Sequence, residues 1–510
     1  MYPDKIDAAV LKIAGVVVLG AIMSILDMTV VNVALPTFQN VFASSPDNPI
    51  AYSTVAWTVT GYTLALATVI PLTGWAADRF GTKRLYIAAI ALFTAGSALC
   101  TAATSINMLI LFRVLQGLGG GLLMPLGMTI MTRAAGPARM GRLMAILGVP
   151  MLLGPIMGPI LGGWLILHAD WHWIFLINVP IGALAVAYAF WALPRDNPQP
   201  SESLDILGMA LMSPGLAAFL YGISSIPGEG TFFSKKVGIP ATIGVVMLAA
   251  FVWHAFRPKH PLLDLRLFRN RDLTVATVTM FLFGAAFFGG LLLVPTYFQQ
   301  IRGESTLNAG LLVAPQGIGA MLTMPIAGAL ADKFPVGRIV PVGLVLIITG
   351  MFGFTQITST SSYTMLIGLL FVMGLGMGAT MMPIMTSALK TLGRHEVARG
   401  STLLNIVQQI ASSIGVAIMS VLLTNHLKDS QLAMPAIGSW RDPSLIDKIG
   451  GPAKLAQGLA EAASAFASTY WVAAFMVAFT LVPAFFLPRK RQPAPLTADD
   501  DVDHQPIMVH

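Results

Sequence analysis

The sequence is poor in charged residues and has almost no cysteine. Only 10% of its 510 residues are Asp, Glu, Lys or Arg, whereas 55% are hydrophobic. This balance lies outside the range of soluble globular chains, so we expect the bilayer to be the main solvent. The one cysteine, Cys100, excludes an intrachain disulfide.

Several catalytic and cofactor motifs are also missing. No Gly-rich run ends in Gly-Lys-Ser/Thr, and no segment between the apolar runs is long enough for a nucleotide-binding domain, which argues against ATP as the energy source. The sequence has neither a His/Cys metal cluster nor a Gly-x-Ser-x-Gly nucleophile elbow. We therefore expect no enzyme, no cofactor and no metal. Basic loops beside a membrane explain the net charge of +7 better than nucleic-acid binding does.

What the chain has instead is a series of unbroken apolar runs of about twenty residues, the length of a membrane-spanning helix. The first run, from Val10 to Leu35, contains Asp27 and lacks a small-residue cleavage site, so we read it as a retained helix. Fourteen spans are predicted, at residues 10–35, 55–76, 85–104, 106–130, 141–166, 172–194, 206–226, 237–256, 273–298, 307–331, 338–357, 364–389, 400–425 and 468–488.

The distribution of basic residues predicts the orientation. If both termini are cytoplasmic, only seven of the 30 Lys and Arg residues fall in external segments: Lys235, Lys236, Arg302, Lys428, Arg441, Lys448 and Lys454. Positive residues concentrate in cytoplasmic loops. We therefore predict a multi-pass protein of the inner (plasma) membrane with both termini inside, surrounded by lipid and monomeric.

An internal repeat divides the chain. Residues 74–84 read GWAADRFGTKR, and residues 328–338 read GALADKFPVGR, so each copy has Gly four residues before Asp. The copies follow spans two and ten, which fits two six-helix halves separated by an inserted pair. The predicted units are an N-terminal bundle (1–196), an inserted pair (197–258) and a C-terminal bundle (259–488). That bundle has an external loop at 425–467, and a disordered tail follows at 489–510.

The first copy resembles the signature loop of the major facilitator superfamily, and fourteen helices resemble its drug:proton antiporter family. Residues 26–36 (LDMTVVNVALP) and 173–182 (WIFLINVPIG) are similar to that family's first-helix and sixth-helix motifs. Span five carries Gly148, Gly154-Pro155, Gly158-Pro159 and Gly162-Gly163, similar to the antiporter motif of exporters. The resemblance implies an all-α major facilitator fold and export rather than uptake.

Asp27 and Arg113 are the two ionisable residues well inside the predicted spans. Both lie roughly 10 to 12 Å below the outer surface, counted at 1.5 Å per residue. An unpaired charge there costs several kcal/mol, so we expect the two to share a cavity. Asp27 is our hypothesis for the proton site, with Arg113 as its partner. The alternative is a fixed ion pair that only locks helix one to helix four.

The repeat predicts gates. An acid at this position can bind helix N-terminal amides or a basic residue across the two halves, so we assign gating to Asp78, Arg79, Arg84 and Asp332. Plain cytoplasmic positive charge is the alternative for Arg84. Gly154, Pro155, Gly158 and Pro159 are assigned to a hinge in span five, with close helix packing as the alternative.

The predicted cargo pocket is mostly apolar with a few orienting polar groups. Its candidate residues are Asn32, Trp57, Tyr62, Gln116, Phe283, Phe287, Tyr297, Gln316, Asn405 and Gln408. Aromatic and amide residues also join helices together, which is the alternative role for this set.

Three functions remain open from the sequence. The first is proton-coupled antiport of hydrophobic or monocationic drugs. The second is a dedicated proton-coupled exporter of an endogenous lipid or amphipathic metabolite. The third, a membrane sensor that does not transport, fits poorly because Asp27, Arg113 and both gate loops are present.

Overall fold

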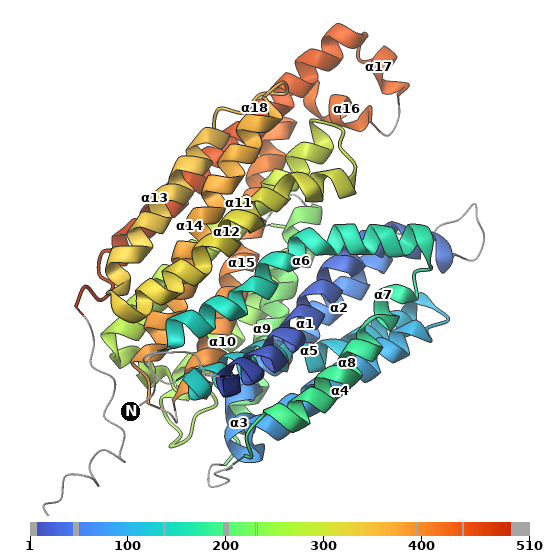
Figure 1. Ribbon diagram of the computed structural model, residues 1–510. Helices are drawn as coiled ribbons and strands as arrows, with labels where there is room; N and C mark the ends of the chain where they lie inside the picture. The colour runs from blue at the N-terminus through green and yellow to red at the C-terminus, as the bar shows by residue number, and fades with distance from the viewer. Residues whose placement is uncertain are drawn as a thin grey trace, which may run out of the picture.

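The computed structural model describes residues 8–43, 50, 52–135, 139–196, 203–229, 231, 233–393, 396–440 and 443–490. All regular elements in this part of the chain are helical (Figure 1). Their bounds are α1 (Ala8–Val41), α2 (Tyr52–Val69), η1 (Ile70–Leu72), α3 (Thr73–Phe80), α4 (Thr82–Thr101), α5 (Ile106–Ala135), α6 (Met140–His168), α7 (Trp173–Leu176), α8 (Asn178–Ala192), α9 (Ile206–Glu229), α10 (Lys235–Ala255), η2 (Leu265–Arg269), α11 (Arg271–Gln300), α12 (Thr306–Lys333), α13 (Val336–Phe354), α14 (Tyr363–Lys390), α15 (Val397–Lys428), α16 (Ala433–Gly438), α17 (Leu445–Lys448) and α18 (Pro452–Ala484).

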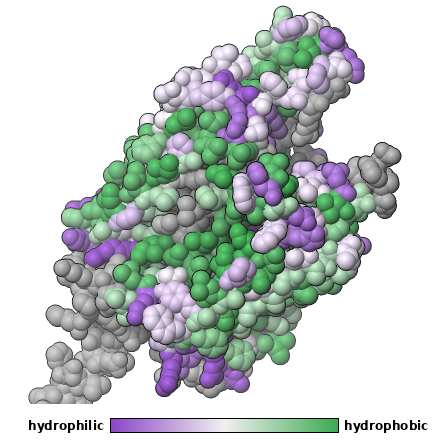
Figure 2. Space-filling view, turned by 45° about the vertical axis from the view of Figure 1, so that its right-hand side comes forward, coloured by the Kyte–Doolittle hydropathy of each residue, from purple (hydrophilic) through white to green (hydrophobic). Residues whose placement is uncertain are grey.

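The helices account for the predicted spans. Within the described residues, thirteen helices are long and apolar enough to cross a membrane. The 29-residue α6 is a further apolar helix of spanning length, which brings the number to fourteen. Figure 2 shows the corresponding surface, with a broad hydrophobic region between hydrophilic patches near the two ends of the molecule. The chain is therefore an all-α multi-pass membrane protein.

Two helical bundles lie side by side (Figure 1). Helices α1 to α8 pack mainly on one another, and so do α11 to α15 with α18. The bundles meet where α6 lies along α12, and the approach is so close that a Cβ on Gly328 would lie 2.5 Å from the Gly141 carbonyl oxygen. Glycine at both positions permits this contact. Helix α1 begins and α18 ends at the same end of the bundles (Figure 1), and we call this end the terminal face.

The inserted helices α9 and α10 pack on each other, and α9 contacts both α2 and α15. Leu216 and Leu220 of α9 share one buried apolar cluster with Ile70 of the first bundle and Ile406 of the second. The inserted pair therefore bridges the two bundles along one side of their interface.

Asp205 fixes the terminal-face end of this pair. Its carboxylate accepts hydrogen bonds from the Gly208 amide (2.8 Å), from His254 Nε2 (2.8 Å) and from the Leu262 amide (3.2 Å). Burial acts to raise the pKa of Asp205, but the three hydrogen bonds and the His254 charge outweigh burial, so the pKa lies below its ordinary value. One carboxylate thus joins α9, α10 and the segment that leads to the second bundle.

The segment predicted as an external loop, residues 425–467, is mostly helical, which corrects that boundary. Helix α15 continues to Lys428, α18 already begins at Pro452, and the short helices α16 and α17 lie between them. The first turns of α18 are rich in Ala but also carry Lys454, Gln457 and Glu461. The predicted span begins only at residue 468 because these polar residues lower the mean hydropathy. The segment is nevertheless helical, since Ala, Lys, Gln and Glu have high helix propensity. Almost all of the predicted tail, 489–510, lies outside the described residues.

Candidate functional site

Asp27 of α1 and Arg113 of α5 lie together inside the first bundle. Their side chains form an ion pair between Asp27 Oδ2 and Arg113 Nη1, and neither side chain is exposed. The tight packing of α5 on α1 and α2 brings these residues to the same depth. Removing either partner of a buried ion pair leaves an unpaired charge in an apolar environment, so the groups around the pair decide what it can do.

Two amide side chains also donate to the Asp27 carboxylate, and a serine hydroxyl joins these amides. Gln116 Nε2 donates to Asp27 Oδ1 (2.8 Å), and Asn178 Nδ2 donates to the same oxygen (3.0 Å). Both amides also donate to Ser97 Oγ, at 2.8 and 3.0 Å. Helices α1, α4, α5 and α8 therefore contribute to one network around a single carboxylate.

Arg113 is held on several sides, but one of its nitrogens is free. Its Nε donates to the Thr58 carbonyl (3.1 Å), its Nη1 also donates to Gln116 Oε1 (2.7 Å), and its guanidinium lies 4.1 Å from the centre of the Tyr62 ring. Nη2 is buried and has no hydrogen-bond partner among the described residues. The site therefore holds one unused donor beside the ion pair.

Among the predicted gate residues, Asp332 joins the two bundles. This residue ends α12 in the second bundle, and its carboxylate accepts hydrogen bonds from the Gly141 amide (2.8 Å), the Arg142 amide (3.4 Å) and Arg142 Nε (3.2 Å). Gly141 and Arg142 form the first turn of α6, where free amides and the helix dipole favour an anion. Asp332 is thus placed as the gate hypothesis requires, at the terminal face.

The other three predicted gate residues lie within the first bundle. Asp78 forms a partly exposed ion pair with Arg133 (3.3 Å), and Arg79 is exposed next to it near the end of α3. The Arg84 amide donates to Asp196 Oδ2 (2.9 Å), so this stretch is held by a carboxylate that caps α4. Gating stays a prediction for all four residues.

The glycines of the predicted hinge are packed against α1. A Cβ on Gly154 would lie 2.1 Å from Ile25 Cγ2, and a Cβ on Gly158 would lie 2.3 Å from Thr29 Oγ1. Close packing, the alternative weighed for these residues, therefore describes them. Pro155 and Pro159 belong to the helical backbone of α6, but their side chains lie outside the described part of the structure, so a hinge stays a prediction.

The predicted cargo residues fall into separate groups. Tyr62 and Gln116 belong to the ion-pair network, and Tyr62 also shares a hydrogen bond with Ser24 (3.1 Å). Trp57 is 40% exposed and stacks on Tyr221 of the inserted pair with ring centres 5.5 Å apart. Asn32 is exposed and donates to the carbonyl of its own helix at Met28. The sequence predicts which helix carries each of these residues, but it does not predict whether the side chain faces the interior of the bundle.

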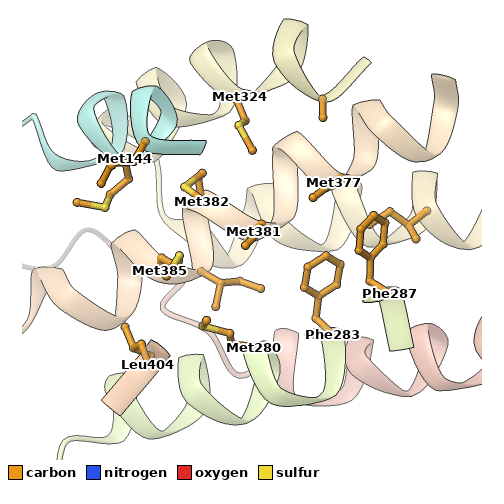
Figure 3. Close-up of a cluster of buried hydrophobic side chains, with 14 of the residues drawn as sticks. Met144, Met280, Phe283, Phe287, Met324, Met377, Met381, Met382, Met385 and Leu404 are labelled. Carbon is orange, nitrogen blue, oxygen red and sulfur yellow. The ribbon is translucent and has the colours of Figure 1, made fainter. Parts of the chain in front are cut away.

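In the second bundle, Phe283 and Phe287 stack with ring centres 5.2 Å apart. Asn405 donates to Met128 Sδ across the bundles (3.1 Å), Tyr297 donates to the Thr358 carbonyl (2.5 Å), and Gln408 is half-buried. Figure 3 shows the stacked rings facing a group of buried methionines, and we call the labelled side chains the Met/Phe cluster: Met144, Met280, Phe283, Phe287, Met324, Met377, Met381, Met382, Met385 and Leu404.

Comparison with known proteins decides the family. Residues 17–416 match the model of the Major Facilitator Superfamily. The chain belongs to this superfamily. A relative named multidrug resistance protein B homolog, from Mycobacterium tuberculosis, is 46% identical over 505 residues, which cover 96% of this chain and 92% of the relative. The multidrug export protein EmrB of Haemophilus influenzae is 31% identical, covering 83% of this chain and 82% of the relative.

Solved structures agree with the major facilitator fold. The human organic anion transporter MFSD10 superposes with a TM-score of 0.59 at 16% identity, covering 94% of this chain and all of that one. The proton:xylose symporter XylE superposes with a TM-score of 0.58 at 16% identity, covering 94% and 96% of the two chains. The named relatives are multidrug resistance proteins of the fourteen-helix type, so the chain is a membrane transporter and not an enzyme.

Several residues of this major facilitator transporter were missed from the sequence. Ser97, Thr58 and Asn178 complete the ion-pair network, and Arg142 completes the contact of Asp332. Asn178 lies in the sixth-helix motif, so a search for polar residues at the depth of Asp27 could have found it. Ser97 and Thr58 carry no such signal, because hydroxyl residues are common in membrane helices.

Proposed function

We propose that this transporter exports hydrophobic or monocationic compounds across the plasma membrane in exchange for protons. Both termini are then cytoplasmic, and the terminal face is the cytoplasmic end of the molecule. The observation that carries the proposal is the Asp27 carboxylate, which is buried and accepts hydrogen bonds from Arg113, Gln116 and Asn178. The relatives of this transporter, which are named as multidrug resistance and multidrug export proteins, support the proposed class of cargo.

Protonation of Asp27 would disturb this network in a defined way. The ionised carboxylate accepts from every neighbour, whereas a protonated one carries an O–H donor that would face other donors. Arg113 would also lose its counter-charge, and a buried unpaired charge is strongly destabilising, by about 3 to 5 kcal/mol. A protonated Asp27 therefore favours a conformation in which Arg113 is hydrated or binds another acceptor.

Alternating access would use this difference. In the conformation described here, hydrogen bonds between the bundles lie at the terminal face, at Asp332 with Gly141 and at Thr129 with Ser401 (2.8 Å). This face is closed. A proton entering from the opposite face would load Asp27, and opening of the terminal face would release it as cargo enters. Energy is available, since one charge crossing 100 mV gains about 2.3 kcal/mol.

The test is ethidium efflux from energised cells, with a protonophore added to a parallel sample. Asp27→Asn keeps the shape of the side chain but cannot carry the proton, so we expect efflux to fall to the protonophore level while the protein stays in the membrane. Asp170→Asn is the matched control, because Asp170 lies in the same bundle but its side chain is 55% exposed and pairs with His172 at the surface. Proton-dependent efflux that survives Asp27→Asn would refute the assignment.

A further inference from the structure

Gln316 of α12 is a buried amide without partners. The residue is 3% exposed, and neither its Nε2 nor its Oε1 has a hydrogen-bond partner among the described residues. Leaving a buried donor or acceptor unpaired costs about 1 to 3 kcal/mol for each group. Leaving both Nε2 and Oε1 of Gln316 unpaired therefore destabilises this conformation unless a ligand forms hydrogen bonds with them.

The position of Gln316 relates it to the Met/Phe cluster. It lies on α12 one turn from Ala320 and two turns from Met324, and all three residues are buried. Its backbone touches α14 at Gly374, where an added Cβ would lie 2.0 Å from the Gln316 carbonyl oxygen. Gly374 is one turn from Met377, which faces Phe283 and Phe287 in Figure 3. Gln316 therefore lies two helical turns from Met324 on its own helix, and its backbone contacts α14 one turn from Met377.

This half of the molecule carries no charge at that depth. The central parts of its six spanning helices contain no Asp, Glu, Lys, Arg or His, namely residues 273–298, 313–328, 340–354, 366–389, 401–423 and 466–484. A cation in this environment would have no counter-charge, and burying it would be costly. The surroundings therefore favour an uncharged ligand.

We propose that Gln316 and the Met/Phe cluster form a subsite for uncharged aromatic cargo that carries a carboxamide or lactam group. The Gln316 amide offers one donor and one acceptor side by side, and a lactam edge offers the complementary acceptor and donor, so the two can form paired hydrogen bonds. Phe283 and Phe287 supply ring faces for stacking, and methionine side chains adapt to the rest of the ligand.

The subsite proposal rests on the proposed export function, and it limits the cargo bound at this position to neutral molecules. Its test is binding alone, with purified full-length protein in lipid nanodiscs and equilibrium dialysis against empty nanodiscs. Three probes share one ring system: 6(5H)-phenanthridinone has the lactam N–H and C=O, 5-methyl-6-phenanthridinone lacks the N–H, and 5-methylphenanthridinium is a cation.

We expect wild-type protein to bind the lactam about ten-fold tighter than its N-methyl analogue, the ratio that one net hydrogen bond gives. Gln316→Leu should remove this ratio, weaken the N-methyl analogue only by the one hydrogen bond that its carbonyl still accepts, and leave binding of the cation unchanged. Equal affinity of lactam and N-methyl analogue for the wild-type protein overturns the proposal, and this comparison needs no variant. So does a Gln316→Leu protein that loses affinity for all three probes equally.

The result separates this subsite from the proposed function. A chain that shows the ten-fold ratio but no proton-dependent efflux has the subsite and lacks the antiport. A chain with Asp27-dependent efflux and equal probe affinities is an antiporter whose cargo is bound elsewhere.

Discussion

Asp332→Asn should open the terminal face of the transporter. The Asp332 carboxylate is 2% exposed and binds Gly141 and Arg142 of the opposite bundle, so its hydrogen bonds exist only while the bundles are in contact there. Asparagine can still accept from the Gly141 amide. Its second terminal atom, however, is an NH2 donor that would face the Arg142 donors.

The size of the effect follows from these contacts. A hydrogen bond to a charged group contributes about 1.5 to 3 kcal/mol, and the substitution removes the charge-assisted contact with Arg142 and places two donors together. We therefore expect a loss of about 2 to 3 kcal/mol from the closed state. Since about 1.4 kcal/mol is a factor of ten, the equilibrium should shift about 30- to 150-fold toward the open terminal face.

Spin labels can measure this shift. Cys100 is buried and is the one native cysteine, so replacing it with alanine gives a cysteine-free background. Labels at Leu11 of α1 and Phe486 beyond α18 would report the separation of the bundles, because these residues are 51% and 58% exposed near the terminal face. Double electron–electron resonance on the Leu11→Cys/Phe486→Cys pair should show a longer distance population in Asp332→Asn.

Asp196→Asn provides a matched control. Asp196 also accepts hydrogen bonds from two amides of a helix N-terminus, Lys83 (2.8 Å) and Arg84 (2.9 Å), but all these residues belong to the first bundle. The same chemical change should therefore leave the distance distribution unchanged. The reasoning fails if Asp332→Asn gives the wild-type distribution, or if Asp196→Asn produces an equal shift.

Two further predictions concern stability. Gly158→Ala places a Cβ 2.3 Å from Thr29 Oγ1, so overpacking should destabilise the protein by about 1 to 3 kcal/mol and lower the Tm in a thermal unfolding scan. Gly163→Ala is the control, because no atom lies within 4 Å of the added Cβ, and it should not lower the Tm. Asp205 has a lowered pKa, so its contribution is complete above the ordinary aspartate pKa of about 4 and is lost as pH falls through the lower folded-state value. Unfolding measured from pH 7 to pH 3 should therefore depend less on pH in Asp205→Asn, and equal pH dependence of the two proteins would contradict the linkage.

The pairing of Asp27 with Arg113 could be anticipated because depth along a helix is a one-dimensional quantity that can be counted from the sequence. Which side of a helix faces which neighbour could not be counted. Hydrophobic periodicity gives little help in a bilayer, since lipid-facing and core-facing residues are both apolar. Trp57 shows the result: it lies in a predicted span, but it packs on the inserted pair.

The internal repeat was more informative about the site than composition was. It identified an Asp at a fixed spacing from a Gly, at the same place in both halves of the chain. It singled out Asp332 but not its partner, since Arg142 lies 190 residues away and has no motif that marks it. The start of α18 shows the opposite limitation. Its Ala-rich first turns are helical by propensity, while hydropathy, the signal used for spans, is low there.

Helix α6 connects the proposed gate with the proposed proton site. Its first turn, at Gly141 and Arg142, binds Asp332 of the other bundle. Farther along, Gly154 and Gly158 lie against Ile25 and Thr29 of α1, which are two residues before and two residues after Asp27. Because glycine leaves no side chain between these helices, a movement of α6 when the bundles separate acts directly on the backbone that carries Asp27. In the proposed cycle, opening of the terminal face would therefore be linked mechanically to the charge state of Asp27, and a close α1–α6 contact would serve that link better than a freely flexible hinge.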